Sequence, residues 1–148
     1  MYSLSFQVDF GKDNEVFRKA LLIREEIFVK EQKINIEDEF DEYDDESFHV
    51  IGSTKDGVVI CCARIIKKNN RWYFGRIAVN LHYREVGYAS KLLKFLEDYL
   101  LNTLGINTVY LDAQFPVVYF YEKMGYILIP DEEVKAVIPC RLMFKELW

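Results

Sequence analysis

One segment in the middle of the chain, residues 75–93, constrains the fold more than any other. An apolar strand ends at Val79, and from Val86 onward leucines recur at helical spacing. The loop between them carries Arg84 and Gly87. A helix N-terminus offers unpaired N–H groups and a positive dipole end to an anion. The segment therefore predicts a phosphate-binding turn, although an ordinary strand–loop–helix connection explains this short pattern equally well.

The remaining pattern predicts a mostly antiparallel sheet that contains one parallel crossover. Asp13 is expected to cap the first long helix, whose inner face carries Phe17 and Phe28. A second helix spans 86–104, and a third runs from Pro116 to Gly125. The strand–helix–strand order around 86–104 implies the crossover. Strands are predicted at residues 3–9, 49–53, 58–66, 72–79, 108–113, 126–129 and 141–147. Lys55-Asp-Gly57 and Asn69-Asn70 predict turns between the second, third and fourth of them.

Length and composition favour a single domain over residues 1–148. Apolar residues make up 51% of the 148 positions, which is ample for one core. The chain shows neither an apolar run of about 20 residues nor a secretion signal, so we expect no membrane span and a cytoplasmic location. The three cysteines form neither a disulfide framework nor a zinc motif, so no metal is expected.

The charge is concentrated in one short acidic segment. Eight of the ten residues from Glu37 to Glu46 are acidic, so the rest of the chain carries −5 + 8 = +3. The chain has no basic stripe with interleaved aromatic residues, so nucleic-acid binding is not predicted. The acidic segment is either a solvated face or an attractor for a cationic substrate. Arg24 and Arg64 lie on apolar segments and need carboxylate partners, so we expect part of the acidic segment to fold back over them.

Two motifs together resemble the GNAT family of N-acetyltransferases. Arg84-x-x-Gly87-x-Ala89 resembles the family's Q/R-x-x-G-x-G/A signature, and Phe120-Tyr121-x-x-x-Gly125-Tyr126 resembles its F-Y-x-x-x-G-F segment. The N-terminal half resembles the ElaA-like subgroup, through Arg24, Phe28-x-x-Glu31-Gln32, Glu39-x-Asp41-x-x-Asp44, His49 and Arg64, and Leu111-Asp-Ala-Gln114 also fits. The resemblance implies an α/β (α+β) fold: a mixed, mostly antiparallel sheet of six or seven strands flanked by about four helices, with one parallel β-α-β crossover.

The resemblance also implies that the chain binds acetyl-CoA. The backbone from Val86 to Ser90, with Arg84, would hold the pyrophosphate, and the strand end would line the pantetheine. Gln114 stands where many members contact the cofactor, although capping the following helix is an equally good interpretation. The cofactor-binding residues implied in this way are Ile77, Ala78, Val79, Arg84, Val86, Gly87, Tyr88, Ala89, Ser90 and Gln114.

Tyr121 matches the family tyrosine that protonates the departing thiolate. A general base must also take a proton from the acceptor ammonium, and the candidates Glu31, Glu39, Asp41 and His49 stay open. The C-terminal segment from Val137 to Met143 departs from the subgroup, because Cys140 stands where a histidine is usual. Cys140 is therefore a further candidate catalytic residue. Glu85 also departs from the family pattern, since many members have a glycine at this position beside the expected phosphates.

Three functions remain open from the sequence. The leading one transfers acetyl from acetyl-CoA to a primary amine of a small molecule or peptide, by direct attack in a ternary complex. Acyl-homoserine-lactone synthases share the core and the pattern of Arg24 with the acidic segment, and they form the second. The third is a non-catalytic acetyl-CoA-binding module, suggested by Glu85 and Cys140. The acceptor is not readable, and a homodimer is compatible with the sequence.

Overall fold

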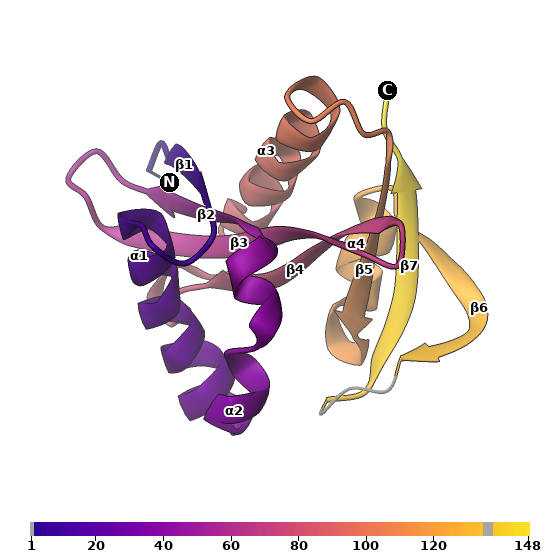
Figure 1. Ribbon diagram of the computed structural model, residues 1–148, viewed down its shortest axis with the longest axis horizontal. Helices are drawn as coiled ribbons and strands as arrows, with labels where there is room; N and C mark the ends of the chain where they lie inside the picture. Colours follow the sequence, from indigo (N-terminus) through magenta and orange to yellow (C-terminus); the bar gives the residue numbers. More distant parts are fainter. Residues whose placement is uncertain (1, 135–137) are drawn as a thin grey trace.

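The computed structural model describes residues 2–134 and 138–148, so Val137 of the C-terminal segment lies outside it. Within these residues seven strands form one sheet in the order β1-β2-β3-β4-β5-β7-β6 (Figure 1). Every neighbouring pair is antiparallel except β4 and β5. The strands are β1 (Ser5–Phe10), β2 (Phe48–Ser53), β3 (Val59–Lys68), β4 (Arg71–Val79), β5 (Thr108–Gln114), β6 (Ile127–Val134) and β7 (Cys140–Glu146).

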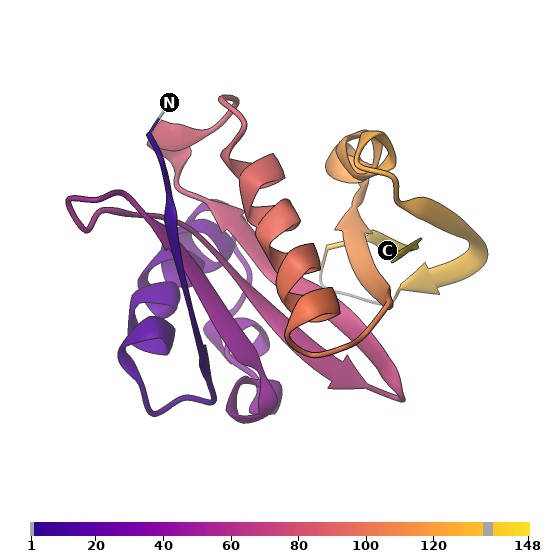
Figure 2. The ribbon, with the colours of Figure 1, turned by 90° about the horizontal axis from the view of Figure 1, so that it is seen from above.

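Helices cover both faces of this sheet. The helices α1 (Glu15–Arg24) and α2 (Ile36–Glu39) lie on one face, and α3 (Tyr88–Asn102) lies on the other (Figure 2). The short helix α4 (Val118–Lys123) follows β5. Because α3 provides the crossover from β4 to β5, those two strands run parallel. The expected mixed sheet with a single parallel crossover is thus confirmed for the described residues.

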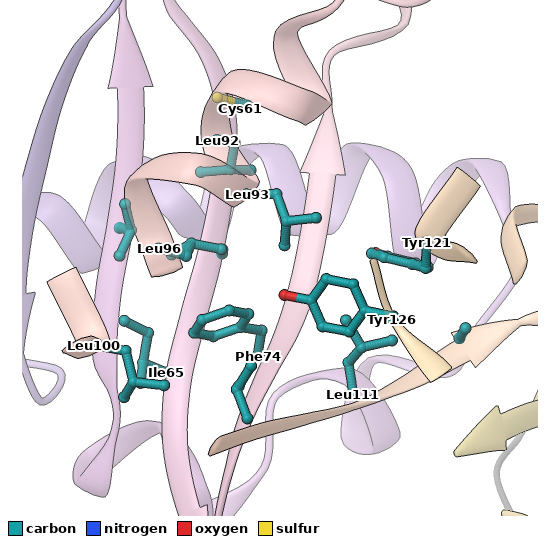
Figure 3. Packing of buried hydrophobic residues seen from close by; sticks show 14 of the residues in the cluster. Cys61, Ile65, Phe74, Leu92, Leu93, Leu96, Leu100, Leu111, Tyr121 and Tyr126 are labelled. Carbon is teal, nitrogen blue, oxygen red and sulfur yellow. The ribbon is translucent and has the colours of Figure 1, made fainter. Parts of the chain in front are cut away.

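The larger core lies between α3 and the sheet. Leucines at every third or fourth position of α3 meet Ile65, Phe74 and Leu111 of the central strands (Figure 3). A second, smaller core lies under α1, where Ala20 and Ile23 pack on Ile51. Strand residues alternate between these two faces, and β2, β3 and β4 contribute residues to both cores.

Several predicted boundaries differ from the observed ones. Asn14, not Asp13, caps α1, because its side-chain oxygen accepts a hydrogen bond from the Phe17 N–H at 2.8 Å. The second helix begins at Tyr88 rather than Val86, because Gly87 adopts a left-handed conformation that the helix cannot include. The segment after α1 is a π-helix, Glu25–Glu31, rather than more α-helix.

The two predicted hairpin turns are present, and their backbone explains their sequence. Asn69 and Asn70 connect β3 to β4 with φ of 52° and 64°. Asparagine tolerates this left-handed region better than most residues, and two such residues in succession match the twist of a tight hairpin. Gly57 occupies the other turn with φ of 86°. None of the described helices is long and apolar enough to cross a membrane.

Candidate active site

A cleft opens where the two parallel strands separate. Strands β4 and β5 pair only at Tyr73–Tyr110 and Phe74–Leu111. Beyond these pairs β5 continues along β7 and β4 continues along β3, so the two strands diverge. Side chains and backbone of both strands line a cleft of about 1250 Å³ at this point. The edge of β4 from Gly75 to Val79 thus faces the cleft without a strand partner on that side.

A β-bulge shapes this open edge. Opposite β3, the register advances from Gly75 to Ala78 on β4 while β3 advances only from Cys62 to Arg64. The extra residue lies on β4, and Arg76 there has φ of 51°, a strained value for a side chain other than glycine. After the bulge Ile77 and Val79 pack against the α3 core, while Ala78 joins the α1 core. The bulge thus re-aims the strand end and bends its backbone at the cleft.

The turn that precedes α3 presents helix N–H groups to the cleft. Gly87, with φ of 94°, is the N-cap, and no side chain caps this end of the helix. The N–H groups of Tyr88, Ala89 and Ser90 therefore have no partner within the helix, and all three residues line the cleft. Glu85 also has a positive φ, 66°, in this turn. Such a turn suits an anion with several acceptor oxygens.

Two side-chain contacts connect the end of the π-helix to both sides of the cleft. Glu31 receives two hydrogen bonds from the Arg84 guanidinium, at 2.8 and 2.9 Å. These hydrogen bonds lower the pKa of Glu31. The next residue, Gln32, exchanges two amide hydrogen bonds with Gln114 at the end of β5, at 3.3 and 3.1 Å. The segment after α1 therefore connects the turn that precedes α3 to the end of β5.

A closed ring of alternating charges holds the acidic segment against the sheet. Arg24 pairs with Glu39 and Asp44, and both arginine and carboxylates are at most 2% exposed. Arg64 pairs with Asp44 and Asp41, and Arg76 closes the ring by pairing with Asp41 and Glu39. The expected fold-back of acidic residues over Arg24 and Arg64 is confirmed. The sequence did not suggest Arg76, although a basic residue in an apolar strand is the same signal.

The proposed acid Tyr121 lies in the wall of the cleft. It comes from α4 and is 8% exposed, with its ring edge-on to Tyr126 at 5.7 Å between centroids. Burial, and a smaller effect of Cys140, raise the pKa of Tyr121 above its ordinary value. Cys140 also lines the cleft, and its thiol donates to the Ile138 carbonyl at 3.2 Å. Burial raises the pKa of Cys140 to about 11, so the thiol is protonated near neutrality.

Most residues selected from the sequence share this cleft, but Val86, His49 and Asp41 do not line it. Of the described residues that line it, thirteen were expected: Glu31, Glu39, Ile77, Ala78, Val79, Arg84, Gly87, Tyr88, Ala89, Ser90, Gln114, Tyr121 and Cys140. Val86 is 48% exposed and lies outside the lining. His49 is fully buried beside the ring: its Nε2–H donates to the Asp44 carbonyl at 2.9 Å, and burial lowers its pKa. The structure does not bring His49 to the cleft.

Sequence reasoning also missed Asp112 and Lys68, which are further charged residues of the cleft. Asp112 is the one acidic residue of β5, and its side chain is open to the cleft. Loss of hydration raises the pKa of Asp112, although Lys68 opposes this effect. Lys68 ends β3, and its Nζ lies 5.2 and 5.3 Å from the ring centroids of Tyr43 and Tyr73. A carboxylate in a short apolar strand was the available signal for Asp112.

Comparison with known proteins places this geometry among acyltransferases. Residues 17–126 match the model of the Acetyltransferase (GNAT) family. The chain is 34% identical over 138 residues to the uncharacterized N-acetyltransferase YjcF of Bacillus subtilis, covering 92% of this chain and 96% of that one. The fold is similar to Escherichia coli ElaA, with a TM-score of 0.82, 24% identity, and coverage of 97% and 100%. It is also similar to the spermidine N-acetyltransferase of Vibrio cholerae in complex with CoA and spermine, with a TM-score of 0.70, 13% identity, and coverage of 95% of each chain.

Proposed function

Because this chain belongs to the Acetyltransferase (GNAT) family, we propose that it transfers the acetyl group of acetyl-CoA to a primary amine, by direct attack in a ternary complex. The family supports acyl transfer from acyl-CoA to an amine in general terms. One observation carries the finer proposal: an uncapped helix N-terminus behind Gly87 faces the cleft in which β4 and β5 separate. That arrangement offers a pyrophosphate site and an extended channel in one continuous space.

The pyrophosphate is proposed to bind the N–H groups of Tyr88, Ala89 and Ser90. At Tyr88 only the backbone is available to a ligand, because the ring is buried and the hydroxyl accepts a hydrogen bond from the Tyr2 N–H. Arg84 stands beside this turn and is held by Glu31. A diphosphate would compete with Glu31 for the guanidinium, so Arg84 can contact the cofactor without a large movement of the backbone.

The pantetheine arm is proposed to lie along the open edge of β4. Its two amide groups match a strand edge whose N–H and C=O groups have no partner on that side, from Gly75 to Val79. The bulge at Arg76 bends this edge where the thioester would lie. Gln114, at the end of β5, borders the opposite side of the channel.

Tyr121 is proposed as the general acid. When the amine attacks, the thioester C–S bond breaks and the thiolate of CoA needs a proton. The raised pKa keeps the Tyr121 hydroxyl protonated at neutral pH, so it is in the state that can donate. Cys140 is not required for direct attack, and its protonated thiol is a poor nucleophile.

The acceptor is proposed to be a primary amine of a small molecule or peptide. The spermidine N-acetyltransferase of similar fold holds spermine in its structure, and the similar N-acetylglutamate synthase of Neisseria gonorrhoeae holds coenzyme A and N-acetyl-glutamate. These two ligands differ in charge, so an acceptor screen must include cationic, neutral and anionic amines.

The test compares two tyrosines of the same helix. Tyr121→Phe is expected to lower kcat by about 10²–10⁴-fold in a thiol-release assay with an amine panel, with the Kd for acetyl-CoA unchanged by calorimetry. Tyr119→Phe is the matched control, because Tyr119 lies two residues away and is 70% exposed. Equal activity of the two variants would remove Tyr121 as the acid. Absence of acetyl-CoA binding by the unaltered protein would contradict the whole proposal, and tight binding without transfer to any amine would favour a binding module.

A further inference from the structure

We propose that Asp112 is the general base of the reaction and accepts the proton of the acceptor ammonium. This inference rests on the proposed acetyl transfer. It fills the role for which the sequence left Glu31, Glu39, Asp41 and His49 open. The proposal follows from where Asp112 lies on β5, from the partners of the other acidic residues, and from the face of the sheet that each group occupies.

Asp112 lies at the apex of the cleft. Leu111 forms the last parallel pair with β4, so Asp112 is the first residue of β5 after the strands part. Among the described residues its carboxylate has neither a hydrogen bond nor an ion pair within bonding distance. It is therefore free to accept a proton at the point where the thioester channel begins.

The other carboxylates of the cleft are occupied or lie elsewhere. Glu31 is bound by Arg84 beside the turn that precedes α3. Glu39 is buried in the charge ring, between Arg24 and Arg76. Glu85 belongs to the turn before α3 and would face phosphates. Asp38 remains exposed on α2, at the rim, so it is the natural comparison for Asp112.

Asp112 and Tyr121 act from opposite faces of the sheet. Leu111 and Ala113 belong to the α3 core, so the alternation of β5 directs Asp112 to the face covered by α1 and α2. Tyr121 belongs to the core on the α3 face and reaches the cleft from there. A thioester threaded between the diverging strands would thus meet a base on one side and an acid on the other.

The proton balance follows from these two positions. Asp112 takes one proton from the ammonium, and the freed nitrogen lone pair forms the N–C bond with the thioester carbonyl. The nitrogen releases a second proton to water as the C–S bond breaks. Tyr121 supplies one proton to the thiolate and regains one from water, and Asp112 passes its proton to water. The net products are the amide, CoA with its thiol, and one proton released to water, after which both side chains return to their starting states.

Neighbouring groups tune Asp112 for this role. The titratable and charged side chains that share the cleft with it come from several elements: Glu31, Asp38, Glu39, Arg64, Lys68, Tyr73, Arg76, Tyr83, Arg84, Glu85, Tyr88, Tyr121 and Cys140. Loss of hydration in the cleft raises the pKa of Asp112, which makes its carboxylate a stronger base. Lys68 opposes that shift, because its positive charge favours the ionised carboxylate.

The experiment uses the full chain and three variants, after the amine panel has identified a working acceptor. Asp112→Asn is expected to lower kcat by about 10²–10⁴-fold and to abolish the acidic limb of the kcat–pH profile. The Kd for acetyl-CoA and the melting temperature should stay unchanged, since the carboxylate makes no hydrogen bond or ion pair with a described residue. Asp38→Asn, at the rim, should keep kcat within about twofold.

Lys68→Met tests the assignment without touching the base. Removing the positive neighbour raises the pKa of Asp112, so the acidic limb should move to higher pH. An unshifted limb in Lys68→Met, or normal kcat in Asp112→Asn, would overturn the role of Asp112 while acetyl transfer itself stands. Loss of acetyl-CoA binding in the unaltered protein is a separate result that would overturn the transfer reaction and this role together.

Discussion

At the scale of single residues, Glu85 has a side chain that its backbone conformation disfavours. Its φ of 66° lies in the region where a side chain costs about 1–2 kcal/mol relative to glycine. The resemblance to GNAT proteins implies that glycine is frequent here, and the structure supplies a physical reason. The carboxylate also stands in the turn that is proposed to receive phosphates.

Two substitutions separate strain from charge at Glu85. Glu85→Gly should raise the free energy of unfolding by about 0.5–1 kcal/mol, because relief of strain exceeds the added entropy of the unfolded chain. Glu85→Gln keeps the strain, so its stability should be unchanged. Both should bind acetyl-CoA more tightly, since both remove a negative charge. Denaturant titration and calorimetry measure the two effects, and weaker cofactor binding by either variant would contradict the placement of the pyrophosphate.

Individual residues were predictable where the local backbone alone dictates them. Gly87 and the Asn69–Asn70 turn follow from the need for positive φ, and the structure confirms these conformations. Asp112 was missed because its significance depends on where β4 and β5 part. That point is set by pairing between residues far apart in the sequence, which single-strand patterns do not contain.

At the scale of elements, the charge ring attaches the acidic segment to β3, β4 and α1. Arg64 contributes two of its six ion pairs, and Arg64 is 3% exposed. Removing one member of a buried pair leaves an uncompensated charge in a poorly solvated place. The ring therefore stabilises the segment only as long as every member is present.

Arg64→Met should lower the free energy of unfolding by about 3–5 kcal/mol, because Asp41 and Asp44 lose their shared partner. The stability of Arg64→Lys should fall between those of the unaltered protein and Arg64→Met, since lysine keeps the charge but not the bidentate geometry. Arg18→Met is the surface control: Arg18 pairs with Glu15 in solvent, so the loss should be below about 1 kcal/mol. Thermal and urea unfolding compare the three, and a stable Arg64→Met would show that the ring contributes no stability.

Elements whose conformation depends on this ring were the least predictable. The acidic segment contains both α2 and a 3-10 turn, Glu42–Glu46. Neither has a helical apolar period, because its buried residues are the carboxylates Glu39 and Asp44. The π-helix after α1 was not predicted, since α and π segments share the same residue preferences and differ by tertiary contacts.

At the scale of the whole molecule, two parts of the sheet meet along a short seam. Strands β1 to β4 form one part and β5, β7 and β6 the other, and the seam consists of two parallel pairs (Figure 1). The sequence predicted the strands and the crossover but not the insertion of β7 between β5 and β6. Strand order depends on long-range packing, so the local pattern does not determine it.

Binding of acetyl-CoA across this seam should change hydrogen exchange in a localised way. A cofactor in the cleft is expected to slow exchange of the open β4 edge, residues 77–79, and of the first turn of α3. The pairs between β1 and β2 lie far from the cleft and should exchange at an unchanged rate. Exchange followed by mass spectrometry, with and without acetyl-CoA, distinguishes this pattern from a uniform slowing, which would instead indicate global stabilisation without a defined site.

The alternating ring also constrains how this sequence can diverge. Each of its six members neutralises two neighbours, so a substitution at any one position leaves two charges unmatched. Tolerated change is therefore expected in compensating pairs, an arginine together with a carboxylate, rather than one position at a time. Across descendants of this chain, the six positions should be inherited as a single block while the five outward acidic residues of the same segment drift freely.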